Sequence, residues 1–202
     1  MAVPADWDFN LTNWLLYATA YVSAPTSLKY NPPVYTYIHA ISKKTEFQDL
    51  KTGRIVSNFR SDRIISFYPT FIFRHQTAPG AVTPDTGYMV RIDRNYAKLY
   101  RRLNAVETKL GEGAISPILV DNTWYQFRVT WWTSYDYQNN PSLACRVERW
   151  YYGAWVTITT LYDTQNLGLD TNTNRPGVGA YNNTALADHY VLHDDTELWI
   201  PT

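Results

Sequence analysis

Four carboxylates lie close together near the end of the sequence: Asp188, Asp194, Asp195 and Glu197. If this segment is a strand, side chains alternate between its two faces, so Asp195 and Glu197 share one face. A retaining glycosidase needs two carboxyl groups about 5 Å apart, which such a pair could supply. The other interpretation of the cluster is a solvated strand end or a structural ion site.

Two histidines in the same segment, His189 and His193, are the second group that could bind a metal ion. Along a strand they would lie about 13 Å apart, which is too far for one ion, so we do not expect a histidine metal site. The single cysteine, Cys145, excludes an intrachain disulfide and a multi-cysteine zinc site. The sequence contains neither a G-x-S-x-G nucleophile motif nor a glycine-rich phosphate loop.

Aromatic side chains and amides are concentrated in a stretch that follows the clearest predicted strand, and the next turn adds further aromatic residues. Flat aromatic rings can pack against the apolar face of a sugar, while amides bind its hydroxyl groups. The expected binding surface consists of Trp132, Tyr135, Tyr137, Gln138, Asn139, Asn140, Trp150, Tyr151 and Tyr152. The alternative is that these rings only cover the rim of the fold.

The composition is that of a neutral chain rich in aromatic residues. Among 202 residues, 18 Lys and Arg balance 18 Asp and Glu, which gives no attraction to nucleic acid or to anionic membranes. The 17 tyrosines, 8 tryptophans and 7 phenylalanines exclude an intrinsically disordered chain. We find no apolar run long enough for a transmembrane helix and no signal-peptide pattern at the N-terminus. We expect one domain over residues 1–202.

Strands must position these residues, because short alternating runs are separated by turn residues along the whole chain. The predicted strands are 34–41, 64–74, 88–93, 98–103, 107–110, 123–132, 143–150, 155–162, 177–181 and 188–200. Pro69 interrupts the second strand and indicates a bulge or an edge. Helix is expected only near Asp49 or over Leu11–Tyr17.

The clearest strand, 123–132, predicts which side chains form the core. Its inward residues are expected to be Tyr125, Phe127, Val129 and Trp131. The alternation then turns Trp132 outward. A tight turn over 151–154, which contains a glycine, should join the two following strands as a hairpin.

Seven stretches occur in a familiar order: Asp8–Asn10 with Trp14, Phe71–Arg74, Gly87–Ile92, Asn122–Val129, Arg146–Val156, Gly177–Tyr181 and Ala187–Leu192. Their order and spacing resemble the concanavalin A-like lectin/glucanase superfamily, including its laminin-G-like members. The resemblance implies an all-β fold, a jelly-roll sandwich of two antiparallel sheets. It also implies that the first strand pairs next to the last and that the chain ends are adjacent.

Members of this superfamily include glucanases, polysaccharide lyases, lectins and virion modules, so the fold alone does not decide the activity. Glucanase-type members carry the string E-x-D-x-x-E on one strand, and this sequence has no such string. Related sandwiches often bind calcium near the adjoining chain ends. The corresponding oxygen donors here would be Asp8, Asp188, Asp194 and Asp195, with surface acids that bind no ion as the alternative.

The sequence therefore predicts a non-catalytic, lectin-like surface module used for glycan binding or for particle assembly. A virion or phage surface, or another extracellular surface, is the expected setting for a chain without a signal peptide or disulfide. The expected partners are a glycan or other virion or surface proteins, with a homo-oligomer left open, and neither nucleic acid nor an inserted membrane. No cofactor is expected apart from the calcium ion. The alternative is a glycoside hydrolase or polysaccharide lyase with diverged catalytic residues.

Overall fold

The computed structural model describes the strands and most of the turns between residues 7 and 200. The described residues are 7–9, 14–17, 27–30, 37–42, 51–75, 86–104, 106–165, 175–186 and 189–200. Only the backbone is described for residues 7–9, 14–17, 27–28 and 37–39. Asp49 and Asp188 lie outside the described residues, and so does the side chain of Asp8. No helix in the described ranges is long and apolar enough to cross a bilayer.

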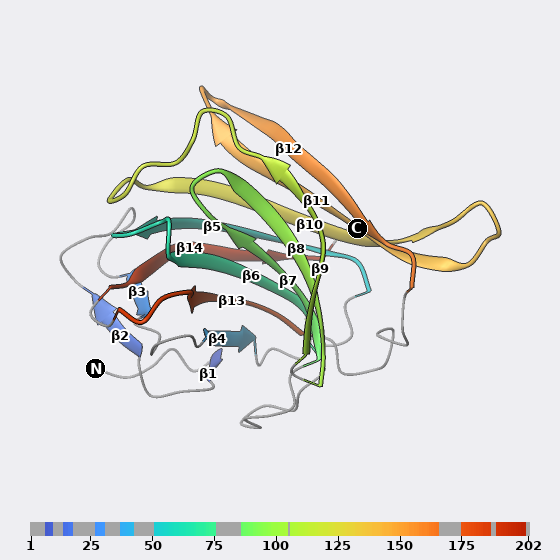
Figure 1. The fold of residues 1–202 in the computed structure, drawn as a ribbon, viewed down its shortest axis with the longest axis horizontal. Helices are drawn as coiled ribbons and strands as arrows, with labels where there is room; N and C mark the ends of the chain where they lie inside the picture. Colours follow the sequence, from blue (N-terminus) through green and yellow to red (C-terminus); the bar gives the residue numbers. More distant parts are fainter. Residues whose placement is uncertain are drawn as a thin grey trace.

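The described residues form two antiparallel sheets that face each other (Figure 1). Sheet A has the strand order β1 (Trp7–Phe9), β4 (Tyr37–Ser42), β13 (Arg175–Asn182), β6 (Phe67–His75), β7 (Gly87–Ile92), β8 (Tyr96–Leu103) and β9 (Val106–Ala114). Sheet B has the order β12 (Ala154–Asp163), β11 (Pro141–Tyr151), β10 (Tyr125–Tyr135), β5 (Gly53–Ser61), β14 (Val191–Trp199), β3 (Ser27–Tyr30) and β2 (Trp14–Tyr17). The predicted all-β sandwich is therefore confirmed.

Two predictions about the N-terminal part are wrong. Residues 14–17 form strand β2 instead of a helix, because they pair antiparallel with β3 from Trp14 opposite Tyr30 to Tyr17 opposite Ser27. The first strand does not lie beside the last one. β1 pairs with β4 in sheet A, whereas β14 lies between β5 and β3 in sheet B.

Strand β6 differs from the prediction made from Pro69. It is flanked by β13 and β7, so it is not an edge strand, and the register shift with β13 falls between Arg175 and Gly177. Pro69 lies opposite Ala180 of β13, while the pairing with β7 begins only at Thr70. The proline is tolerated because it stands at the end of the β7 ladder.

The core lies between the sheets and follows the predicted alternation of β10. Phe127, Val129 and Trp131 are fully buried, and Tyr125 is half-buried against the same cluster. Trp131 stacks on Phe73 of sheet A, with ring centroids 5.0 Å apart and planes 18° apart.

Gly53 gives Trp131 the room that this stack requires. The two residues lie opposite each other on β5 and β10. A Cβ atom on Gly53 would lie 2.4 Å from the indole ring, which no real contact allows. Phe73 in turn stacks on Tyr88, at 5.8 Å and 11°. Three rings therefore form a column that joins the two sheets.

A buried polar link joins the sheets at the β12 side. Tyr88 donates a hydrogen bond of 2.8 Å from its hydroxyl group to Asp163 Oδ2. Arg101 Nη1 donates to both carboxylate oxygens of Asp163, at 3.1 and 3.0 Å. Burial, together with the Asp163 charge, raises the pKa of Tyr88. The carboxylate thus has partners on two strands of sheet A, as a buried charge requires.

His193 makes a second polar link across the core. It is 1% exposed, and its Nε2 atom donates to the carbonyl oxygen of Gly179 at 3.0 Å. This fixes the neutral tautomer, so Nδ1 accepts a hydrogen bond from Ser57 Oγ at 2.9 Å. Ser57 also lies 2.9 Å from Thr196 Oγ1. Burial lowers the pKa of His193 from 6.5 to about 3, although the Gly179 carbonyl acts in the opposite direction.

The first prediction tests the core. Phe127→Ala should lower the free energy of unfolding by about 3–5 kcal/mol, because truncating a fully buried aromatic side chain leaves a cavity. Gln126→Ala, one residue away on the outer face, should change it by less than about 0.5 kcal/mol. Urea unfolding measures both. Similar losses for the two variants would contradict the assigned register of β10.

The second prediction concerns pH. His193 stays neutral in the folded protein down to about pH 3, whereas the unfolded chain takes up a proton near pH 6.5. The stability that the neutral His193 side chain contributes is therefore fully present above pH 6.5 and is lost as the pH falls toward 3. His193→Gln should not show this loss. As the pH falls below 6.5, the free energy of unfolding of the variant should therefore decrease less steeply than that of the wild type, by up to about 1.4 kcal/mol per pH unit. Parallel pH profiles in urea unfolding would refute the buried neutral histidine.

Candidate functional site

The outer face of sheet B combines tryptophan and arginine side chains. They point outward because the residues between them on β10, Phe127, Val129 and Trp131, point into the core. The outward side chains that make up this face are Arg54 on β5, Arg128, Thr130 and Trp132 on β10, Arg146, Glu148 and Trp150 on β11, Trp155 and Tyr162 on β12, and Trp199 on β14. We call this set the arginine–tryptophan face.

Glu148 is the electrostatic centre of this face. Arg128 donates two hydrogen bonds of 2.6 Å, from Nε and Nη2, to the two carboxylate oxygens of Glu148. Arg146 Nε lies 3.4 Å from the same carboxylate. One negative charge is thus shared by two guanidinium groups, so the three side chains together keep one positive charge. The bidentate geometry also fixes the position of Arg128.

The rings of the face are held by the same cations. The Arg128 guanidinium lies 4.3 Å from the ring centroid of Trp155, and that of Arg146 lies 6.0 Å from Trp132. Trp150 packs edge-to-face on Trp155 at 5.3 Å. Such contacts keep large rings in place while leaving part of each exposed. Trp150 is 42% exposed, and Trp132 is half-buried.

Arg54 adds a second positive charge beside Trp132. It lies opposite Thr130 on β10 and donates from Nε to Thr130 Oγ1 at 3.3 Å. Within the described part of the chain, no carboxylate forms an ion pair with Arg54. On the other side of Thr130 lies Arg146. Two arginines therefore flank one hydroxyl group on this face.

The predicted loop after Trp132 is a rigid hairpin tip. Tyr135 pairs with Pro141, so residues 136–140 close the turn between β10 and β11. Asp136 accepts hydrogen bonds from the side chain of Asn140 and from the backbone amides of Asn140 and Gln138, which together lower its pKa. Tyr137, at the tip, is 93% exposed.

The amides of this tip, which are exposed, bond largely to one another and to neighbouring side chains. Gln138 Nε2 donates to the Tyr137 hydroxyl at 3.2 Å, and Asn140 Nδ2 donates to both Asp136 Oδ2 and Gln138 Oε1. Asn139 has a φ of 61°, which the turn requires. The amides therefore stabilise the loop, and the rings of Tyr135 and Tyr137 are exposed beside them.

The tip and the turn at Trp150, Tyr151 and Tyr152 do not form the single surface that was predicted. The two groups lie at opposite ends of the β10–β11 and β11–β12 hairpins (Figure 1). An eleven-residue strand separates them by about 30 Å. The predicted tight turn itself is confirmed. Tyr152 and Gly153 both have positive φ, 50° and 79°, as a two-residue hairpin turn requires.

The acids near the C-terminus lie at a bulge that the regular alternation did not predict. A bulge between Asp194 and Glu197 breaks the alternation, and Asp195 has a φ of 47°. Asp195 Oδ2 accepts from Asn58 Nδ2 at 3.2 Å, while Glu197 Oε2 accepts from Trp199 Nε1 at 3.1 Å. Asn58 and Glu197 both point to the outer side of sheet B, so the hydrogen bond from Asn58 places Asp195 on the same side as Glu197.

The predicted calcium ligands are only partly described. Asp8 lies on β1 in sheet A, whereas Asp194 and Asp195 belong to β14 in sheet B, and Asp188 is outside the described residues. No three His, Cys, Asp or Glu side chains gather as a metal site within the described ranges.

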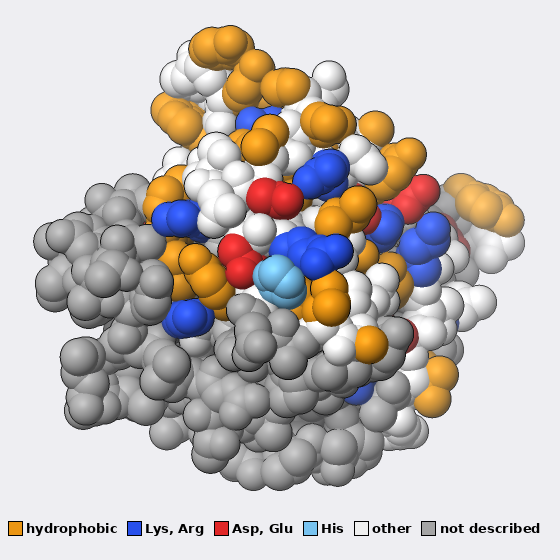
Figure 2. Space-filling view, turned by 60° about the vertical axis from the view of Figure 1, so that its left-hand side comes forward, with side chains coloured by type: hydrophobic (Ala, Val, Ile, Leu, Met, Phe, Trp, Pro, Cys, Tyr) orange, Lys and Arg blue, Asp and Glu red, His pale blue; other side chains and the backbone are white. Residues whose placement is uncertain are grey.

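A charged cluster covers the end of the sandwich that Figure 2 turns toward the viewer, where a histidine lies between acidic and basic side chains. His189 Nδ1 lies 3.1 Å from Asp62 Oδ2, and its Nε2 lies 3.5 Å from Arg63 Nη1. Asp62 also accepts from the Tyr190 amide at 2.9 Å. These contacts tie the start of β14 to the β5–β6 loop, so their role is structural.

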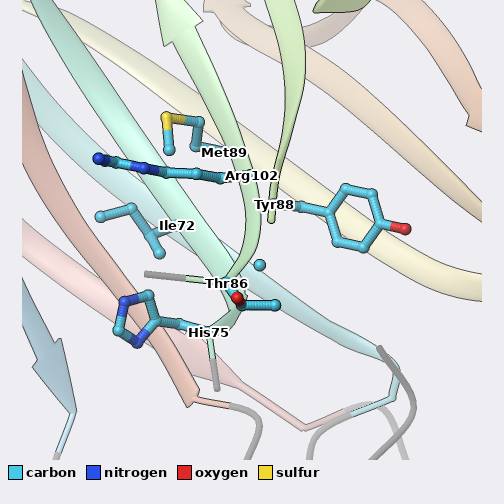
Figure 3. Close-up of a pocket in the computed structure, with 7 residues that line it drawn as sticks. Ile72, His75, Thr86, Tyr88, Met89 and Arg102 are labelled. Carbon is cyan, nitrogen blue, oxygen red and sulfur yellow. The ribbon is translucent and has the colours of Figure 1, made fainter. Parts of the chain in front are cut away.

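Sheet A carries a pocket lined by Ile72, His75, Thr86, Gly87, Tyr88, Met89 and Arg102 (Figure 3). The side chain of Tyr88 points away from those of His75, Ile72 and Met89. The pocket lies where β6 ends and β7 begins, next to residues 76–85, which are outside the described part. We therefore assign it no function.

Sequence reasoning found Trp132 and Trp150 but missed the charged members of the face. Arg54 was missed because β5 was not recognised as a strand. Its alternation was a usable signal: Arg54, Val56 and Asn58 point outward, while Ile55 and Phe59 are fully buried. Glu148 and Arg128 could not be paired without the register of β10 and β11.

Comparison with solved structures places the fold among lectins and carbohydrate-binding modules. The carbohydrate-binding module CBM66 from Bacillus subtilis matches with a TM-score of 0.58 and 10% identity, covering 96% of each chain. The exoplasmic/lumenal domain of VIP36, in a form with Ca²⁺ and Man3GlcNAc bound, matches with a TM-score of 0.60 and 11% identity, covering 98% of this chain and 84% of that one. Lectin II from Ulex europaeus matches with a TM-score of 0.53 and 11% identity, covering 94% and 93%.

No protein-family model and no curated protein matches the chain. At 10–12% identity the structural matches show the fold, which is concanavalin A-like over nearly the whole chain. The resemblance drawn from the sequence is therefore confirmed at the level of the fold.

Proposed function

We propose that the protein is a non-catalytic, lectin-like module that binds glycans on the arginine–tryptophan face. The observation that carries the proposal is the outward ring of Trp132 beside Arg146 and Arg54. An aromatic ring supplies an apolar platform for a sugar, and guanidinium groups supply several donors for its oxygens. The carbohydrate-binding proteins that share this fold support the same class of ligand.

The charged groups of the face favour binding over hydrolysis. Glu148 is 5% exposed and is engaged by Arg128 on both oxygens, so it is poorly placed to transfer a proton to a ligand. Asp195 and Glu197 each accept a hydrogen bond from a neighbouring side chain. The enzyme alternative, a glycoside hydrolase or lyase with diverged residues, needs two carboxylates that converge on one bond.

A second use, attachment to other proteins of a particle, is favoured by the hairpin tip. Tyr135 and Tyr137 are 65% and 93% exposed on a loop that Asp136 holds rigid. Exposed tyrosines on a preorganised loop are typical anchors of protein interfaces. A virion, phage or extracellular surface would use both features, the face for a glycan and the tip for assembly or a homo-oligomer.

The third prediction tests glycan binding. Trp132→Ala should abolish binding on a glycan array, or weaken it by about tenfold or more, because the ring that packs on the sugar is removed. Tyr96→Ala, which removes a ring 38% exposed on sheet A, is the control and should bind as the wild type does.

Reducing-sugar release from β-glucan, alginate and chitin should stay at the level of the buffer blank in the same samples. Equal binding by Trp132→Ala and the wild type would place the glycan elsewhere. Release of reducing ends that Glu197→Gln or Asp195→Asn abolishes would support the enzyme alternative.

The fourth prediction tests the tip. Tyr135→Ala combined with Tyr137→Ala should weaken self-association or particle attachment in analytical ultracentrifugation and co-sedimentation. The thermal midpoint should stay nearly unchanged, because both rings are exposed and Asp136 still brackets the loop. Glycan binding should also survive, since the tip lies beyond the face. Unchanged assembly in the double variant would exclude the tip as an interface.

A further inference from the structure

We propose that the arginine–tryptophan face is specific for an acidic sugar, a hexuronate, whose carboxylate binds between Arg54 and Arg146 above Thr130. This inference rests on the proposed function, because it names the sugar class that the same face would take. Neither the fold nor the matched structures imply it. It follows from the charges and the register of four adjacent strands.

The register places the two arginines on either side of one residue. Thr130 on β10 lies opposite Arg146 on β11 and opposite Arg54 on β5. Neighbouring strands are about 4.8 Å apart, so the two arginine backbones lie about 10 Å apart. Long side chains from both sides can therefore reach one carboxylate between them. The Thr130 hydroxyl lies in the same place and already accepts from Arg54 Nε.

The charge balance of this part of the face is positive. Arg128 and Arg146 share Glu148, which leaves one positive charge, and Arg54 adds another without a carboxylate partner in the described chain. Arg146 is 39% exposed, so its guanidinium is accessible to a ligand. Guanidinium groups match the planar geometry of a carboxylate and bind it in a bidentate manner.

Aromatic rings border the same position, which distinguishes a sugar acid from a simple anion. Trp132 follows Thr130 by two residues and so points to the same side of β10. Trp199, which is 53% exposed, lies opposite Arg54 on β14. A hexuronate has both features that this arrangement recognises: a ring face that packs on an indole and a carboxylate for the arginines.

The distribution of acids gives the expected direction of the polymer. Glu197 is exposed and points outward on β14, at the level of Val56 of β5. It would repel a chain of uronates that ran across β14. On the opposite side, Tyr162 of β12 is 55% exposed and carries no charge. We infer that an acidic chain runs from Thr130 toward β12.

Isothermal titration with oligogalacturonate and with its carboxyl-reduced, neutral counterpart tests this inference. The wild type should bind the acidic oligomer about tenfold more tightly than the neutral one, as charge-assisted hydrogen bonds allow. Arg54→Gln and Arg146→Gln should each lower the affinity for the acidic oligomer more than the affinity for the neutral one, and so remove most of this preference. Lys109→Gln, an exposed lysine on β9 of sheet A, should change neither affinity.

The outcomes separate the inference from the proposed function. The wild type could instead bind both oligomers with equal affinity, and this binding could be lost in Trp132→Ala but kept in the two arginine variants. That result would overturn the acidic specificity and leave glycan binding in place. Binding of neither oligomer, together with an empty glycan array, would overturn both. Two results would show only long-range charge attraction and would also overturn the site. One is that Lys109→Gln loses as much affinity for the acidic oligomer as the arginine variants do. The other is that dextran sulfate binds more tightly than the acidic oligomer and that the arginine variants keep this binding.

Discussion

The packing of Trp131 on Gly53 and Phe73 fixes the register on which the rest of the face depends. The indole fills the space that the missing side chain of Gly53 leaves, and its other contact is a ring of the opposite sheet. A slip of β10 by one residue would put Trp132 in this space and Trp131 outside. The same slip would bury the charges of Arg128. The core thus determines which side chains reach the surface.

The ion pairs of the outer face are a consequence of this register. Because Arg128 lies directly opposite Glu148, their two hydrogen bonds form between adjacent strands without distortion. A carboxylate that is 5% exposed is stable only when it is paired. Pairing with two arginines leaves a positive charge that no further carboxylate among the described residues neutralises by an ion pair. This surplus, rather than the total charge of zero, decides what the face attracts.

Alternation in β10 was readable from the sequence because its inward residues are large and apolar. Phe127, Val129 and Trp131 were predicted inward and are fully buried. The neighbouring strand β5 was not recognised, since Ser57 stands between Ile55 and Phe59 in its inward row. Ser57 is buried because it bonds to His193, a partner 136 residues away that no local pattern shows. Missing β5 meant missing Arg54.

Long-range geometry explains the other differences. The aromatic groups around Tyr137 and Tyr152 are close in sequence, yet an extended strand carries them to opposite ends of the sheet. Likewise, the bulge between Asp194 and Glu197, and the hydrogen bond from Asn58 to Asp195 that accompanies it, could not be read from the spacing of the acids. Spacing in a sequence therefore predicts a shared face within one regular strand, but it predicts neither the geometry across a turn nor the position of a bulge.

Rigidity and charge together explain why this face suits binding more than catalysis. A general acid must be able to exchange its proton with the ligand, and glycoside hydrolysis needs a second carboxyl group at the same bond. Both oxygens of Glu148 already accept hydrogen bonds from Arg128. In the proposed function, therefore, the rings and guanidinium groups bind the ligand, and Glu148 holds Arg128 and Arg146 in place.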